Sequence, residues 1–143
     1  MKISSLLYGM VAAVVVIVVL LLILGVSFHR PVSAQGAALY DAANEVSVGG
    51  RVQEVQEFDC PVSEGELASH LMLKTTDGVV QVHLAPVRIM ASQKLSFAPG
   101  DQIEVVGSKI RLNGENGVIA REITRGNESF IFRDHEGRLM LVQ

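Results

Sequence analysis

The amino-acid sequence predicts an all-β domain with one short helix, preceded by an apolar N-terminal segment. From residue 45 onward, short runs rich in valine and isoleucine alternate with polar residues, as in half-buried strands. Turns containing glycine, asparagine or proline separate these runs, and only the stretch that begins at Pro86 has helical spacing. We therefore expect an apolar segment over residues 1–28, a linker over 29–44 and a β-domain over 45–143.

The N-terminal segment predicts that the rest of the chain is exported. Residues 6–26 form a run of 21 residues without a charge, which is long enough to span a bilayer and longer than the core of a usual signal peptide. The segment is therefore interpreted as a single-pass signal anchor in the cell membrane. Val32-Ser33-Ala34 also fits a signal peptidase site, so the alternative is cleavage after Ala34. Both interpretations place the β-domain in the periplasm or an equivalent compartment.

The first half of the β-domain is predicted from its glycines and turns. A strand over 45–58 carries alternating valines, and Gly49-Gly50 interrupts it at an expected bulge or bend. Residues 59–69 form a loop that contains Pro61 and Gly65. Asp77-Gly78 is a strong hairpin signal between strands over 70–75 and 79–84. Pro86 then suits the first turn of a short helix.

The second half is predicted in the same way. Phe97 to Asp101 form a turn, and a strand follows over 102–110 with a bend at Gly107. Asn113-Gly114 and Asn116-Gly117 are turn signals that precede a strand over 117–124. Residues 130–132 and 139–142 flank a polar turn over 134–137 and predict a closing hairpin.

The hairpin separates an apolar face from a polar face, because side chains alternate along a strand. With Asp77-Gly78 as the turn, His83 lies opposite Met72 and diagonal to His70. A register change of one residue would put the two histidines on opposite faces. The expected core face comprises Leu71, Leu73, Val80, Val82 and Leu84. The expected ligand-binding face comprises His70, Met72, Lys74, Gln81 and His83.

Cys60, His70 and His83 are the candidate metal ligands, with Met72 as a weak fourth. A thiolate, two imidazoles and a thioether suit copper or zinc, and haem is a further candidate, so the cofactor is left open. The alternative is that two histidines on a solvent-facing hairpin bind nothing. Cys60 is the one cysteine of the chain; as such it is a buried small hydrophobe, a ligand or half of an intermolecular disulfide.

The order of the elements, with a helix between the third and fourth strands, resembles the five-stranded barrel of the OB-fold. The run G-D-Q-I-E-V-V-G at residues 100–107 resembles the fourth strand of such domains. The resemblance implies a binding surface on strands two and three, flanked by the loops over 59–69 and 112–117. The layout over 46–124 also resembles the membrane-anchored haem chaperone of cytochrome c maturation. That family carries an H-x-x-x-Y motif after the barrel, and residues 124–130 contain no histidine, so covalent haem attachment is not expected.

Charge and motifs restrict the function. Residues 35–143 contain 10 Lys and Arg against 15 Asp and Glu, a net charge of −5, which argues against a nucleic-acid partner. Phe58, Phe97, Phe130 and Phe132 are assigned to packing. No G-x-S-x-G or phosphate-binding loop is present, so we expect no enzyme and no catalytic residues. The sequence favours a non-catalytic envelope carrier, with a membrane-tethered protein-interaction or scaffolding domain, docked on an envelope protein, as the alternative.

Overall fold

The computed structural model describes residues 10, 11, 13–17 and 39–140. The chain divides into two compact units, Met1–Val32 and Ser33–Gln143. In the first unit, residues 10, 11 and 13–17 are helical. Within the described ranges, no helix has both the length and the apolar character needed to span a membrane. Most of the expected anchor, residues 29–38 of the expected linker and the site at Ala34 lie outside the described residues.

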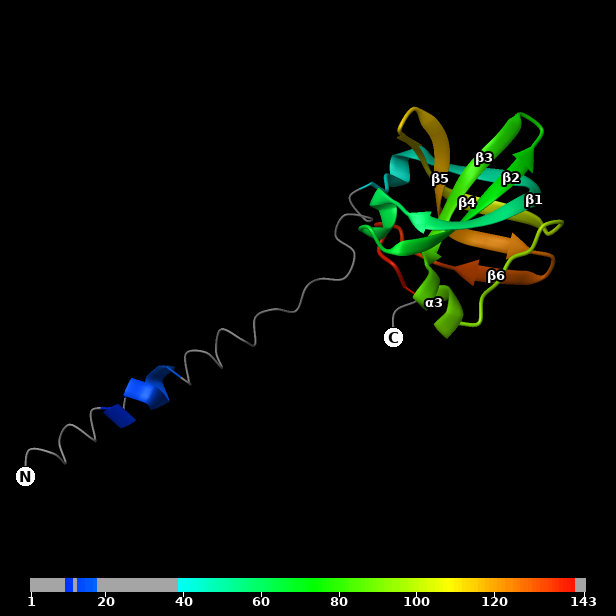
Figure 1. Ribbon diagram of the computed structural model, residues 1–143. Helices are drawn as coiled ribbons and strands as arrows, with labels where there is room; N and C mark the ends of the chain where they lie inside the picture. Colours follow the sequence, from blue (N-terminus) through cyan, green and yellow to red (C-terminus); the bar gives the residue numbers. More distant parts are fainter. Residues whose placement is uncertain (1–9, 12, 18–38, 141–143) are drawn as a thin grey trace, which may run out of the picture. The chain divides into compact units, whose positions relative to one another are not determined.

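The second unit is a β-barrel with one short α-helix, which confirms the predicted fold class (Figure 1). Five strands form the barrel in the order β3-β2-β1-β4-β5, and a parallel pairing of β3 with β5 closes it. The helix α3 lies between β3 and β4 in the chain, as in an OB-fold. The elements are η1 (Ala42–Asn44), β1 (Glu45–Asp59), η2 (Pro61–Ser63), β2 (Leu67–Thr75), β3 (Gly78–Pro86), α3 (Val87–Ser92), β4 (Gln102–Leu112), β5 (Glu115–Arg125) and β6 (Glu128–Ile131).

The long strand β1 changes partner at its glycines. Its first half pairs with β4 and its second half pairs with β2, and Arg51 takes part in both pairings. A Cβ atom on Gly50 would lie 2.4 Å from the carbonyl oxygen of Lys74, so only glycine fits at this crossing. The bend is therefore at the predicted place, whereas the register shift lies a few residues later, between Val52 and Glu54.

The main core fills the barrel. The predicted core residues of the hairpin are buried, except that Val80 is partly buried and packs against the others. The helix α3 contributes Ile89 and Met90 to this core. A second apolar cluster contains Tyr40, Cys60, Val62, Ala68 and Ile119. Since side chains alternate along a strand, this second cluster lies on the other face of the strands that line the main core.

The predicted register of the hairpin is wrong by one step of the ladder. Thr75 pairs with Gly78, so the turn is Thr76-Asp77 rather than Asp77-Gly78. The Thr75 hydroxyl accepts a hydrogen bond from the Asp77 amide at 3.1 Å and donates to the Gly78 carbonyl at 2.9 Å. These bonds fix the turn one residue earlier. The face of every side chain is preserved, but His70 now lies directly opposite His83.

The C-terminal part differs in its pairing. The strand β6 forms a hairpin with β5 across Gly126, whose φ is +61°, and this pairing was not predicted. Within the described residues, one bridge of the expected closing hairpin forms, Arg133 with Leu139. The alternation of β5 is also interrupted: Val106 pairs with Glu122 and Gly107 with Ala120, which leaves Arg121 as an extra residue.

Candidate metal centre

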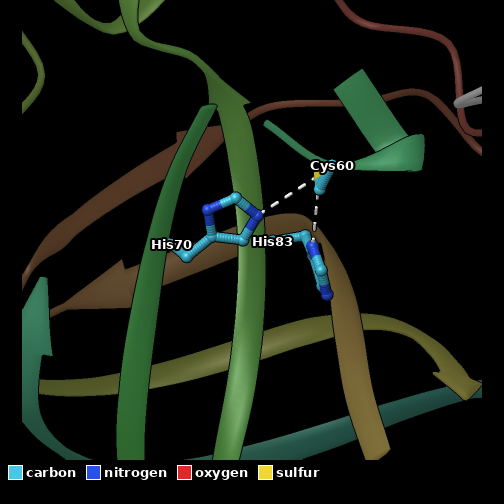
Figure 2. A group of neighbouring side chains, drawn as sticks. All are labelled: Cys60, His70 and His83. Atoms are coloured by element: carbon cyan, nitrogen blue, oxygen red, sulfur yellow. Dashed lines mark hydrogen bonds between the residues drawn. The ribbon is translucent and has the colours of Figure 1, made fainter. Parts of the chain in front are cut away.

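Three potential metal ligands from three segments meet beside the barrel. Cys60 follows the end of β1 and precedes η2, His70 lies in β2, and His83 lies in β3. Figure 2 shows the two imidazoles on neighbouring strands, both directed toward the Cys60 sulfur. Cys60 is 6%, His70 0% and His83 3% exposed. The predicted trio is therefore brought together, but in the interior rather than on a solvent-facing surface.

The spacing of the ligand atoms matches one coordination sphere. The Cys60 Sγ lies 3.3 Å from His70 Nε2 and 3.7 Å from His83 Nδ1, and all three ligand atoms lie within 4.8 Å of one another. Bonds of ~2.3 Å to sulfur and ~2.0 Å to nitrogen place neighbouring ligand atoms roughly 3.3–3.8 Å apart. The sulfur–nitrogen distances already fall in that range, so an ion would require only a small approach of the imidazoles.

The orientation of His70 is fixed by its surroundings. Its Nδ1–H donates to the carbonyl oxygen of Ala68 at 3.0 Å, so Nε2 carries the free lone pair toward Cys60. Phe58 stacks on the imidazole with ring centres 3.8 Å apart and planes at 7°. The ring of His83 meets that of His70 edge-on, at 4.7 Å and 80°. Packing and one backbone hydrogen bond thus fix the orientation of the His70 imidazole.

The loop that carries Cys60 is organised by its own hydrogen bonds. Pro61 begins η2, and Glu64 ends it in the left-handed conformation with φ 59°. The buried Ser63 hydroxyl lies 3.0 Å from the carbonyl oxygen of Cys60 and 2.6 Å from that of Glu66. The same hydroxyl is 3.5 Å from the Cys60 sulfur. The loop therefore folds over the two histidines and shields them from water.

Burial keeps both imidazoles neutral. It lowers the pKa of His70 to about 4, against the opposing effect of the Ala68 carbonyl. It also lowers the pKa of His83 to about 3, and His70 and the positive charge of Arg133 add to this shift. A neutral imidazole has the lone pair that a metal ligand requires. At neutral pH both histidines are thus uncharged, which is the form that a metal ligand requires.

Arg133 is a buried cation next to this cluster. Its side chain is 3% exposed and donates from Nη1 to the carbonyl oxygen of Ala120 at 2.6 Å. Burial lowers its pKa to about 10, and negative charge on Tyr40 or Cys60 acts in the opposite direction. The guanidinium therefore stays charged at neutral pH. Among the ion pairs of the described residues, none includes Arg133.

The remaining residues of the predicted binding face are more exposed than the two histidines. Met72 is half-buried opposite Gln81, rather than opposite His83 as predicted, and Lys74 is exposed near the hairpin tip. The cluster that holds Cys60, His70 and His83 contains no further histidine, cysteine or acidic residue of the described chain. The predicted face thus divides into a buried histidine pair and a half-exposed outer part. The physical reason is that the loop from Cys60 to Glu66 covers only the end of the hairpin remote from its turn.

Two residues beside the centre are not predicted by the sequence. Phe58, expected only to pack, stacks directly on His70, and its place two residues before Cys60 is the one signal of this contact. Nothing in the local sequence indicated that Arg133 would be buried. Its backbone amide donates to the carbonyl oxygen of Arg121 at 3.2 Å, and Arg121 is the extra residue of the β5 bulge.

A cavity of about 590 Å³ lies between the β2–β3 turn, the first half of β1 and the β4–β5 hairpin. Asn116 and Gly117, from one of the two predicted binding loops, line it, whereas the loop over 59–69 does not. Gly117 also borders the metal centre, because a Cβ atom there would lie 3.1 Å from His83 Nε2. The glycine thus separates the cavity from the imidazole by backbone alone.

Comparisons with known proteins identify one matching family and two distantly similar structures. The profile of the MamS/MamX magnetosome protein family matches residues 44–130, which include all three candidate ligands. Comparison with curated proteins gives no match. A chain in the crystal structure of the S. pombe Stn1–Ten1 complex is 15% identical, with 59% of each chain covered and a TM-score of 0.45. The mitochondrial single-stranded DNA binding protein Rim1 of S. cerevisiae is 11% identical, with 60% of this chain and 93% of Rim1 covered and a TM-score of 0.42.

Proposed function

The chain belongs to the MamS/MamX magnetosome protein family, and on this premise we propose that it is a non-catalytic, membrane-associated magnetosome module that binds one transition-metal ion. Cys60, His70 and His83 would be the ligands. The family supports a magnetosome-associated role and association with membrane-related partners. The finer location, with the barrel exported behind an uncleaved anchor, rests on the apolar run at residues 6–26.

One observation carries the proposal: the Cys60 sulfur is 3.3 Å and 3.7 Å from the two imidazole nitrogens that face it. A thiol and two neutral imidazoles are also able to form a closed hydrogen-bonded cluster without any ion. Two features supply what a ligand set requires. His70 is held in the tautomer that leaves Nε2 free, and both histidines stay unprotonated because they are buried.

The enclosure of the site favours an ion over haem. All three side chains are at most 6% exposed, and a porphyrin would need the covering loop to be displaced. Copper and zinc both bind thiolate and imidazole. A sealed site also lacks the open coordination position that metal-dependent catalysis needs, which supports a carrier or structural role rather than an enzyme.

The test is the metal content of the full chain, purified in detergent under reducing conditions and incubated with copper or zinc. We expect close to one ion per chain in the native protein. Cys60→Ser and His83→Gln should each abolish retention, because each removes one of three ligands while nearly preserving side-chain volume. His135→Gln is the matched control, since His135 is exposed and outside the cluster. Native protein that retains neither metal would refute the proposal and leave the scaffolding role.

A further inference from the structure

We infer that the Cys60–His70–His83 site selects a monovalent soft ion, copper(I), over divalent zinc or cobalt. This inference rests on the proposed function and adds the identity of the ion. Two independent features carry it: the number of ligands in a sealed site and the buried positive charge of Arg133.

The first feature is the coordination number. The cluster offers one sulfur and two nitrogens, and the described residues supply no fourth histidine, cysteine or carboxylate within reach. Structural zinc sites almost always have four protein ligands, and catalytic zinc sites complete the fourth position with water. Water has little access here, because His70 is 0% and His83 3% exposed. A trigonal set of one thiolate and two imidazoles is instead a copper arrangement.

The second feature is charge. A divalent ion bound to one thiolate carries a net charge of +1, whereas copper(I) bound to the same thiolate is neutral. Arg133 is a buried guanidinium whose hydrogen bond goes to the backbone oxygen of Ala120 rather than to a carboxylate. That oxygen is close to the centre, because Ala120 follows Ile119, the partner of His83 in the β3–β5 pairing.

Three carboxylates of the described chain pair with other arginines: Glu45 with Arg121, Asp101 with Arg125, and Asp134 with Arg138. No ion pair of the described residues includes Arg133, so a divalent ion would add like charge beside an unpaired cation. At an effective dielectric constant near 20, repulsion between two unit charges inside a small domain lowers affinity on the order of tenfold. A neutral copper(I)–thiolate unit does not incur this repulsion.

The experiment measures copper(I), zinc(II) and cobalt(II) affinities of the reduced full chain in detergent, by anaerobic competition with chromophoric chelators. We expect copper(I) to bind most tightly, with an X-ray absorption spectrum of one sulfur and two nitrogen neighbours. Arg133→Met should raise the zinc-to-copper(I) affinity ratio on the order of tenfold. Arg133→Lys should leave the ratio near the native value, because it keeps the charge. Arg138→Met is the control, since Arg138 is exposed and pairs with Asp134.

The outcomes separate this inference from the proposed function. Absence of binding by any of the three ions refutes the metal site itself. Binding in which zinc or cobalt is preferred, or in which the copper spectrum has four ligands, overturns the copper(I) assignment and leaves the metal site intact. An unchanged ratio in folded Arg133→Met overturns the role of charge. Should that variant not fold, the native preference and the spectrum still decide between the ions.

Discussion

Acidification should destabilise the metal-free protein through its two buried histidines. In the unfolded chain a histidine titrates near pH ~6.5, whereas burial holds the pKa of His70 at about 4 and that of His83 at about 3. The unfolded state therefore binds more protons below about pH 6.5, so stability is lost as the pH falls through this region. Above it, both states are neutral at these residues and stability is flat.

The magnitude follows from proton linkage. Between pH 7.5 and pH 5, each histidine lowers the free energy of unfolding by about 2 kcal/mol, so the pair lowers it by about 4 kcal/mol. That loss is a large part of the ~5–15 kcal/mol that stabilises a typical domain. With a urea m-value of about 1–2 kcal/mol/M, the unfolding midpoint should fall by about 2–4 M.

The assay is urea unfolding at pH 7.5, 6 and 5 in the presence of a chelator. The pKa values of Glu45, Asp101 and Asp134 are lowered by their partners. The stability that these carboxylates contribute is therefore lost only at a more acidic pH. The double variant His70→Gln/His83→Gln should show little dependence in this window. A native midpoint that moves by less than about 0.5 M between pH 7.5 and 5 would refute the burial argument.

Three further predictions use other parts of the fold. Gly107→Ala should cost about 2–3 kcal/mol in urea unfolding, because its Cβ would lie 2.1 Å from the carbonyl oxygen of Ile119; Gly49→Ala, which meets nothing within 4 Å, should be neutral. Tyr40→Phe removes the hydroxyl that donates to Glu45 and should cost about 1–2 kcal/mol in the same assay; an unchanged midpoint would contradict this. A chelator should lower the melting temperature of copper-loaded native protein in calorimetry and leave that of Cys60→Ser unchanged, because an ion bound only to the folded state stabilises it.

The hairpin was predictable because alternation is a strong local constraint. The residues between Leu71 and Leu84 divide into an apolar and a polar set, and the structure keeps that division although the turn lies one residue earlier. The shift arises from two hydrogen bonds of the Thr75 side chain, which compete with the preference of Asp-Gly for the turn. The alternation therefore predicts that the two histidines share one face of the hairpin. It does not predict that they lie directly opposite each other.

The sequence does not predict that the site is buried, and the reason is a different one. Whether the polar face of a hairpin meets water depends on what folds over it, and here the covering loop contains two acidic residues, Glu64 and Glu66. The loop instead turns on Ser63, with its charged side chains outward and Cys60 inward. The burial of Arg133 is not predictable either, because its backbone amide contacts the bulge residue Arg121 of another strand, β5.

The position of the three ligands along the chain has a consequence for assembly. Cys60 and His83 are the ends of one continuous 24-residue stretch, so local hairpin pairing gathers the ligands at a low cost in loop entropy. The parallel contact of β3 with β5, which brings Ile119 beside His83, forms only after a further 36 residues have been added. We expect the ligand set to exist before the barrel closes, so that the two imidazoles and the thiol are already close together when β5 pairs with β3.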